Sequence, residues 1–340
     1  MSKSKQRFRK GISLSFRKSL VLISKVYFQF KKLLRLVVVG LMSPSNRSDF
    51  LNRSRHYENF PLPYYEWKSI EAINLSNWRR PKSFTVWNSG LPIDCRLDSF
   101  ESSPLVVILN GASSRKVRLP WFAGKQVTQD LSCSVLAVSD PTLYLDPSLN
   151  LGWYAGNHLQ PDLVKQLARL IEKVSDSLDS TRIILLGGSG GGFAALSLST
   201  ILRDCDVIAF NPQTCITRYH ANHINSYINL AWNGSKESML NNTRFDLVKV
   251  FKEEKPNANV FYIQNTSDDF HLQGHLKPFL SVNPKTAFFL LNDWGDGHTP
   301  PPKSIIHDIL RAVIENDSQK LLSMGFKRKP TIDQSNNRTH

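Results

Sequence analysis

The chain has little cysteine and no long uncharged apolar run. Its 340 residues include four cysteines, and none stands at the spacing of a metal-ligand or redox motif. We interpret them as buried thiols of a protein in a reducing cytoplasm. No apolar stretch approaches the ~20 residues that span a bilayer, and the N-terminal region has no convincing cleavage site for a secretory signal. These absences argue against a disulfide scaffold and against a membrane span. They favour a cytoplasmic protein, peripheral at most to the inner face of the membrane.

Acidic residues are missing from the first 35 residues, which carry eleven Lys or Arg, so much of the net charge of +15 lies near the ends of the chain. We expect residues 1–55 to form a basic, partly amphipathic arm. Such an arm either lies on an anionic lipid surface or stays solvated. Nucleic-acid binding is disfavoured because no recognition motif accompanies the charge. Residues 326–340 are predicted to be a disordered basic tail.

Between these ends, residues 56–325 alternate buried strands with helices. The predicted strands are 84–87, 93–97, 105–109, 133–138, 182–186, 207–210, 259–264 and 286–291, and the clearest helices are 161–178 and 304–322. The first two strands flank Asn88-Ser89-Gly90 and are expected to form a hairpin. The alternation predicts an α/β fold with a mainly parallel sheet covered on both faces. Residues 214–257, polar and helical in pattern, are expected to be a small cap insertion.

The most informative motif is G-x-S-x-G, formed by Gly187, Ser189 and Gly191. An apolar strand enters it and an apolar helix leaves it. That context matters because the turn is strained and lifts the serine hydroxyl clear of the sheet. The motif therefore predicts Ser189 as a nucleophile in an α/β-hydrolase fold.

Other interpretations of these glycines are weaker. A phosphate-binding Walker loop needs Gly-Lys-Ser/Thr at its end, where this chain has Phe193 and Ala194. A dinucleotide fingerprint over 190–195 expects an acidic residue after the next strand, which here ends in Asn211. A tight turn with an incidental serine is the remaining alternative.

A serine nucleophile needs a base and a carboxylate that orients the base. In this fold they follow the serine in the order acid, then histidine, on loops after later strands. His298 follows the last predicted strand in a loop with two glycines, and it is the predicted base, against the alternative of a surface histidine. Asp268 is preferred to Asp269 as the acid, although either could be a helix N-cap. More distant alternatives are Asp293 and Asp296.

The oxyanion of the reaction needs two backbone N–H donors. One is expected from Gly190, which follows the nucleophile. The other is expected from Gly111 or Ala112, in the loop after the strand 105–109. Their small side chains allow a substrate to approach closely.

Two further pairs of residues have open interpretations. His271 and His275 are four residues apart and could form a metal pair, but no H-E-x-x-H motif is present. We expect no metal and interpret them as supports of the acid loop or as exposed residues. Trp153 and Tyr154 either stack on a sugar as substrate-binding residues or belong to the core.

Together these pieces resemble the α/β-hydrolase-like proteins encoded with bacterial capsular-polysaccharide and surface-glycan synthesis. The similar segments are 110–112, 140–141, 152–157, 186–195, 262–271, 275–279 and 295–298, within residues 84–322. The resemblance implies acyl transfer on a carbohydrate, as a glycan O-acetyltransferase or an esterase, through an acyl-enzyme. It implies no cofactor beyond an acyl thioester donor as co-substrate. The competing hypothesis is an inactive hydrolase-fold protein that binds glycan or a membrane-bound polysaccharide synthesis complex.

Overall fold

The computed structural model describes residues 50–75, 82–100, 102–114, 116–282, 286–328 and 330. In these residues, no helix has the length and apolar character needed to cross a membrane. The predictions for the basic arm before residue 50 and for the tail after residue 330 lie outside the described residues.

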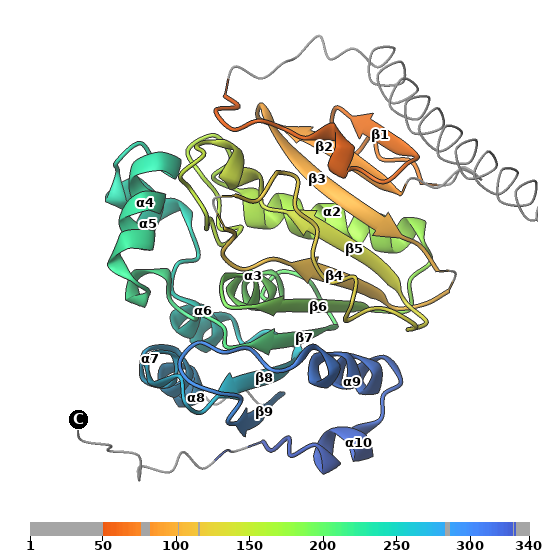
Figure 1. The fold of residues 1–340 in the computed structure, drawn as a ribbon, viewed down its shortest axis with the longest axis vertical. Helices are drawn as coiled ribbons and strands as arrows, with labels where there is room; N and C mark the ends of the chain where they lie inside the picture. The colour runs from red at the N-terminus through yellow and green to blue at the C-terminus, as the bar shows by residue number, and fades with distance from the viewer. Residues whose placement is uncertain are drawn as a thin grey trace, which may run out of the picture. The chain divides into compact units, whose positions relative to one another are not determined.

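The centre of the fold is a nine-stranded sheet with the order β1-β2-β3-β5-β4-β6-β7-β8-β9 (Figure 1). The strands are β1 (Tyr64–Trp67), β2 (Ser83–Asn88), β3 (Leu91–Asp98), β4 (Leu105–Leu109), β5 (Ser134–Ser139), β6 (Ile183–Gly188), β7 (Cys205–Phe210), β8 (Asn259–Asn265) and β9 (Ala287–Asn292). Only β3 runs antiparallel to its neighbours, and every other pairing is parallel. The sheet therefore gathers the carboxyl ends of β4 and β6 to β9 along one edge.

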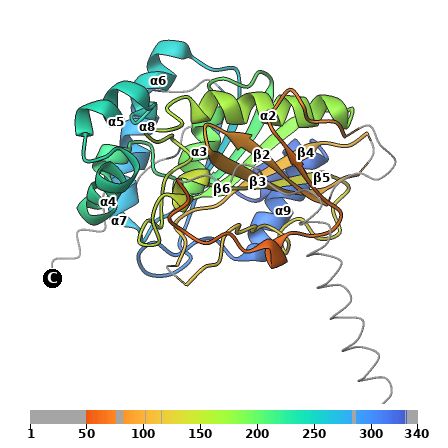
Figure 2. The ribbon, with the colours of Figure 1, turned by 90° about the horizontal axis from the view of Figure 1, so that it is seen from above.

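Helices cover both faces of this sheet, as the sequence predicted. The helices are α2 (Leu163–Ser177), α3 (Gly190–Leu198), α4 (Ala221–Ala231), α5 (Lys236–Asn242), α6 (Leu247–Glu254), α7 (Asp269–His271), α8 (Lys277–Val282), α9 (Lys303–Ile314) and α10 (Ser318–Ser323). Figures 1 and 2 show α2 and α9 on opposite sides of the sheet. Along the chain, the three helices α4 to α6 follow β7 and precede β8, in the segment 214–257.

The strands are apolar on both faces because two cores meet at the sheet. In β4, Leu105, Val107 and Leu109 join the core that contains α2 and α3. The alternate residues Val106 and Ile108 join the core that contains α9 and α10. A strand buried on both sides reads as a continuous hydrophobic run, which is why the sequence located β4 correctly.

The predicted hairpin is confirmed. Strands β2 and β3 pair up to Asn88 opposite Leu91, which leaves Ser89 and Gly90 as a two-residue turn. Both turn residues have positive φ, 47° and 82°. This is the left-handed conformation that a type I′ hairpin requires.

Two predicted boundaries near the C-terminus are wrong. The last helix is two helices, because Asn316 is left-handed and the side chain of Asp317 caps α10 at Lys320. The predicted start of the tail at residue 326 is too early, because Phe326 is buried and Lys327 exchanges backbone hydrogen bonds with Phe289 in β9.

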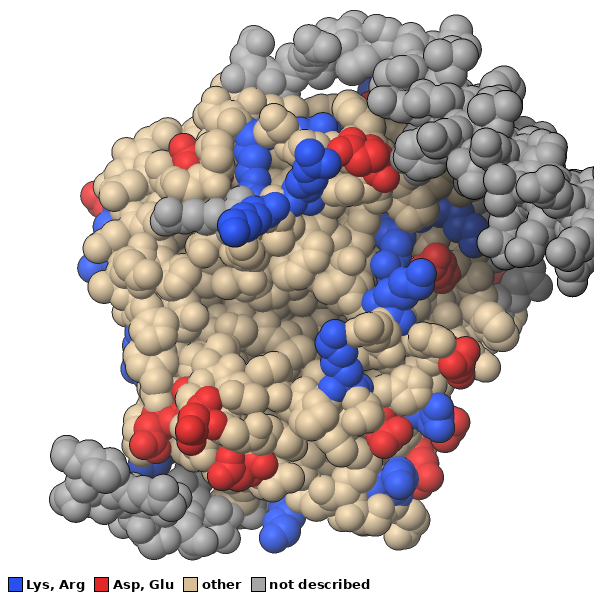
Figure 3. Space-filling view, viewed as in Figure 1, with Lys and Arg blue, Asp and Glu red and all other residues tan. Residues whose placement is uncertain are grey.

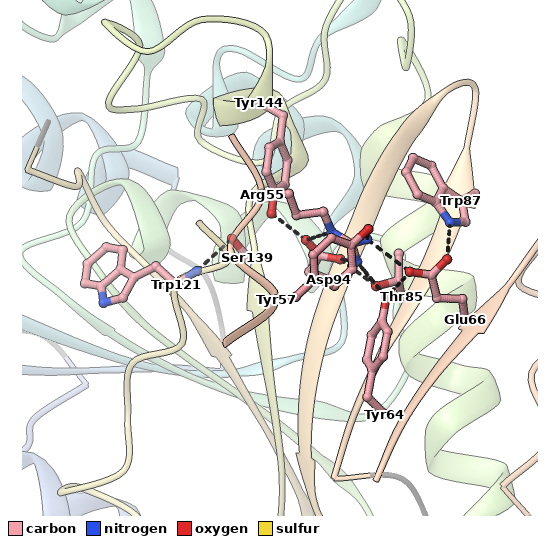
Figure 4. Close-up of polar contacts among 10 residues, drawn as sticks. All are labelled: Arg55, Tyr57, Tyr64, Glu66, Thr85, Trp87, Asp94, Trp121, Ser139 and Tyr144. Atoms are coloured by element: carbon pink, nitrogen blue, oxygen red, sulfur yellow. Dashed lines mark hydrogen bonds and ion pairs between the residues drawn. The ribbon is translucent and has the colours of Figure 1, made fainter. Parts of the chain in front are cut away.

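The arm prediction also extends too far, because residues 53–55 belong to the fold. The side chain of Arg55 is only 4% exposed, and it forms an ion pair with Asp94 of β3 at 2.6 Å and with Glu66 of β1 at 3.1 Å (Figure 4). Arg53 is buried as well and donates to the carbonyl of Leu149. A buried charge is tolerated when it is paired and hydrogen-bonded, and sequence patterns do not reveal such partners.

Gly191 is a site of close backbone approach that can be tested. A Cβ added there would overlap the carbonyl oxygen of Leu109 in β4. We expect Gly191→Ala to lower the free energy of unfolding by about 1–3 kcal/mol, the usual cost of overpacking, measured by urea denaturation. Gly274→Ala is the matched control because no atom lies within 4 Å of its added Cβ. Equal stabilities of the two variants would contradict this close approach.

Candidate functional site

Ser189 lies at the turn between β6 and α3, with φ 55° and ψ −120°. This is a strained conformation for a residue with a side chain, and such strain is concentrated at functional sites. The turn is held by a hydrogen bond from the Ser189 N–H to the carbonyl of Phe210, at 3.0 Å. Glycine is required one residue before and two residues after Ser189. A Cβ at Gly188 would overlap the Phe210 ring, and one at Gly191 would overlap β4. The local structure is the strained strand-turn-helix elbow that the sequence predicts.

Ser189 and His298 line the same pocket, which has a volume of about 490 Å³. Gly111, Ala112 and Tyr219 also contribute to its wall. The pocket lies at the carboxyl ends of the strands, where binding sites of open α/β sheets are found. The predicted nucleophile and the predicted base therefore converge on one cavity.

Asp268 reaches His298 from the loop after β8. Its Oδ2 is 2.6 Å from Nδ1 of His298, and its Oδ1 accepts the N–H of His271 at the start of α7. Burial alone would raise the pKa of Asp268, but the hydrogen bonds from His271 and His298 outweigh it and hold that pKa well below its ordinary value. Asp268 is thus both N-cap and partner of His298. The alternatives Asp269, Asp293 and Asp296 are exposed.

A second imidazole lies beside this pair. Nδ1 of His271 is 2.9 Å from the same Asp268 oxygen, although its angle is outside the range for a hydrogen bond. The rings of His271 and His298 are stacked, with centroids 4.0 Å apart and planes inclined by 19°. Burial, as the largest effect, lowers the pKa of His271, which favours its neutral form. His271 therefore supports the loop that carries Asp268, which is one of the two interpretations that the sequence offered. Its Nε2 also lies 3.0 Å from Nε2 of Gln213.

Gln213, which the sequence analysis missed, holds the hydroxyl of Ser189. Its Oε1 accepts from Nε1 of Trp153 at 3.2 Å, which turns its Nε2 toward Ser189 Oγ at 2.8 Å and toward Nε2 of His271 at 3.0 Å. Among the described residues no hydrogen bond joins Ser189 Oγ to His298. No local pattern marks Gln213, because its partners come from segments distant in the sequence.

Two buried amides fix the loop that carries His298. The side chain of Asn265, at the end of β8, binds the backbone of Trp294, Gly295 and Gly297 at 2.7–3.0 Å. The side chain of Asn211 bridges from the Asn265 N–H to the carbonyl of Thr299. The loop needs its glycines, since Gly295 and Gly297 have φ of 117° and 64°. His298 is therefore aimed by the sheet ends even though 38% of its side chain is exposed.

The predicted oxyanion donors are the backbone N–H groups of Gly111, Ala112 and Gly190, and none of them has an acceptor among the hydrogen bonds of the described part of the chain. Gly111 lies against the elbow, because its added Cβ would be 3.5 Å from Cβ of Ser189. Gly190 is the first residue of α3, where N–H groups have no partner within the helix. Gly111 and Ala112 line the pocket together with Ser189, so these three N–H groups stay the candidate donors of the predicted oxyanion site.

The structure corrects the prediction that Trp153 and Tyr154 bind substrate and supports the alternative, that they belong to the core. Both are almost fully buried, and neither lines the pocket with Ser189. Trp153 orients Gln213, while the Tyr154 hydroxyl donates to the carbonyl of Val138 and accepts the N–H of Asn110. Both residues therefore belong to the core next to the site, and neither ring is accessible for stacking on a sugar.

Asp268, His271 and His298 place three possible ligand atoms within 4.8 Å of one another. Two ligands of a tetrahedral zinc, each ~2.1 Å from the metal, lie ~3.4 Å apart. The Nδ1 of His298 is only 2.6 Å from the Asp268 oxygen. This spacing fits a direct hydrogen bond better than a shared metal ion.

His275 gives the site a predictable acid sensitivity. It is fully buried, its Nδ1 accepts the N–H of Thr214, and burial lowers its pKa from 6.5 to about 3. Between those values the unfolded chain binds a proton that the folded chain does not, so stability falls as pH falls. The loss is at most about 1.4 kcal/mol per pH unit.

We therefore expect the free energy of unfolding to fall from pH 6.5 toward pH 4, and less steeply in His275→Asn, which keeps an acceptor but cannot titrate. Urea denaturation at several pH values measures both slopes. The exposed His158 provides the control His158→Asn. Identical slopes for wild type and His275→Asn would contradict the assignment.

Comparisons with known proteins agree with this fold. Capsule O-acetyltransferase of Neisseria meningitidis serogroup A is similar in structure, with a TM-score of 0.51 at 17% identity, over 67% of this chain and 95% of that chain. A variant of it in complex with CoA has a TM-score of 0.51 at 15% identity, over 66% of this chain and 95% of that one. An acylaminoacyl peptidase of Pyrococcus horikoshii has a TM-score of 0.51 at 12% identity, over 69% and 41%.

The fold is that of the α/β hydrolases. No protein-family model and no curated protein sequence matches the chain.

Proposed function

We propose that the protein is a serine-dependent acyl-transfer enzyme that acts on a carbohydrate, either as an O-acyltransferase or as an esterase. The observation that carries this proposal is the convergence of Ser189 and His298 on one pocket, with Asp268 bonded to the far side of the imidazole. Similarity in fold to a capsule O-acetyltransferase supports the carbohydrate acceptor. The CoA complex of that protein supports a thioester donor.

In the proposed mechanism, Asp268 holds the Nδ1 proton of His298, so that Nε2 is free to act as a base. His298 takes the proton of Ser189, and Oγ attacks the acyl carbonyl carbon. The resulting oxyanion accepts hydrogen bonds from Gly190 and from Gly111 or Ala112. His298 then protonates the leaving thiol or alcohol, and an acyl-enzyme remains. Water or a sugar hydroxyl, deprotonated by His298, releases the acyl group.

The Gln213 contact describes the resting state of the nucleophile. Catalytic hydrogen bonds are often long before substrate binds and shorten in the complex. Rotation of the Ser189 side chain from Gln213 toward His298 is the change that the proposal requires. Gln213 then keeps its bond to Trp153 and loses its contact with the hydroxyl.

The proposal is tested with p-nitrophenyl acetate and with acetyl-CoA as donors, in the presence and absence of methyl glycosides as acceptors. Wild-type protein is expected to release nitrophenol or CoA at a rate that depends on Ser189. A sugar that gains one acetyl group in mass spectrometry identifies a transferase, and donor turnover unaffected by sugars identifies an esterase. Release no faster than with Ser189→Ala would overturn the proposal in favour of a binding protein.

A further inference from the structure

The pocket at Ser189 has two chemically different ends. Its polar end contains Ser189, His298 and Tyr219, together with the side chain of Asn110. Its other end is lined mostly by apolar side chains, with Lys303 beside them, and lies on the face of the sheet that carries α9. The apolar residues there include Ile108, Ala123, Val127, Leu186 and Ile306. Figure 3 shows this face, whose middle is hollowed and uncharged, with Lys and Arg side chains along its border.

The apolar end is a built cavity with fixed walls. Ile108 and Leu186 come from the central strands β4 and β6, and Ile306 from the first turns of α9; all three are at most 4% exposed. Gly124, with φ 90°, lies directly on Ile108, since an added Cβ would be 2.8 Å from its Cγ1. The third wall is therefore the segment 121–128.

That segment is attached on both sides of the cavity. The side chain of Asn110 donates to the carbonyl of Trp121 at 2.8 Å, at the polar end. The Val127 carbonyl lies 3.1 Å from Nδ1 of His307 in α9. The cavity therefore keeps its width between the sheet edge and α9.

The size and chemistry of this cavity exceed what an acetyl group uses. An acetyl group has three heavy atoms and fills only a small part of a pocket that has room for many water-sized groups. The remaining volume, in a pocket of about 490 Å³, adjoins apolar walls. Aliphatic walls offer no hydrogen bonds to sugar hydroxyls or to the amides of a pantetheine arm, whereas methylene groups gain free energy there.

We propose that the apolar end binds the acyl chain, and that the acyl group carried by Ser189 is an aliphatic chain several methylenes longer than acetyl. This inference rests on the proposed function and names its acyl substrate. The carbonyl carbon lies at Ser189 Oγ, the oxyanion faces Gly111 and Gly190, and the chain extends along Ile108 and Val127. The thiol or alcohol leaves with a proton from His298, so the acyl-enzyme forms with atoms and charge balanced.

The chain-length profile of p-nitrophenyl esters tests this directly, because the leaving group stays constant from acetate to dodecanoate. We expect kcat/KM for the octanoate ester to exceed that for the acetate ester by at least tenfold, as successive methylenes are buried. A profile that falls steadily from acetate would overturn the inference and leave the proposed function intact.

A variant that narrows the cavity provides a second test of the inference. In Val127→Phe, the ratio of kcat/KM for octanoate to that for acetate is expected to fall at least tenfold; an inactive fraction of protein cancels in this ratio. Val250→Phe, on the half-buried face of α6 and away from the pocket, is the matched control and should leave the ratio unchanged. An unchanged ratio in Val127→Phe would place the chain elsewhere and overturn the inference.

A binding measurement distinguishes a failure of this inference from a failure of the proposed function. Calorimetry with decanoate, at concentrations below its micellar range, is carried out on Ser189→Ala, which cannot turn over an ester. We expect saturable binding that is weakened at least tenfold when Val127→Phe is added. If no ester is hydrolysed but decanoate binds in this way, the pocket assignment stands and the catalytic proposal fails. Absence of binding to Ser189→Ala overturns the pocket assignment.

Discussion

Replacing Ser189 by alanine is expected to lower ester turnover by about 10³-fold or more and to abolish labelling by a fluorophosphonate probe. The hydroxyl is the atom that forms the acyl-enzyme, so no other group replaces it at the elbow. The measurements are p-nitrophenyl ester hydrolysis and in-gel fluorescence after labelling.

The matched control is Ser197→Ala, in α3, the helix that directly follows Ser189. Ser197 is buried and its hydroxyl has no recorded hydrogen-bond partner among the described residues, so its removal costs little. Labelling that persists in Ser189→Ala would show that another nucleophile reacts. The proposed mechanism would then be wrong even if the fold is right.

Replacing Asp268 by asparagine is expected to lower kcat/KM by about 10⁴-fold, the effect of this change in a serine protease triad. An amide donates where the carboxylate accepts, which leaves His298 in the wrong tautomer. Asparagine still caps α7 at the N–H of His271, so the fold is expected to persist. Ester hydrolysis measures the loss, and the melting temperature checks the fold.

Asp269→Asn is the comparison for this variant, because Asp269 is the next residue and is exposed. We expect its kcat/KM to stay within about twofold of wild type, as for surface changes away from a site. Losses of similar size in the two variants would show that the loop as a whole matters, and that Asp268 does not act specifically on His298.

Features that depend on local patterns were predictable from the sequence. The glycines around Ser189 indicated a strained turn, and the continuous apolar run of β4 indicated a doubly buried strand. The glycines near His298 allowed its loop to turn back toward the elbow. Each inference uses residues within a few positions of one another, where steric and hydrophobic rules act directly.

Features that depend on long-range partners were not predictable. Gln213 contacts Trp153 and Ser189 only after the chain has folded, and a glutamine after a strand carries no signal of its own. The sequence left Trp153 open between a stacking platform and the core, because aromatic residues serve both cores and binding sites. The buried ion pair of Arg55 extended the fold beyond its predicted start, since a charged residue usually indicates solvent.

The shared oxygen of Asp268 has a consequence for how His298 is held in place. The stacked rings of His271 and His298 face one carboxylate, so each ring restricts where the other can lie. Removing the ring of His271 would therefore leave the imidazole of His298 freer to tilt, even though His271 does not itself line the cavity.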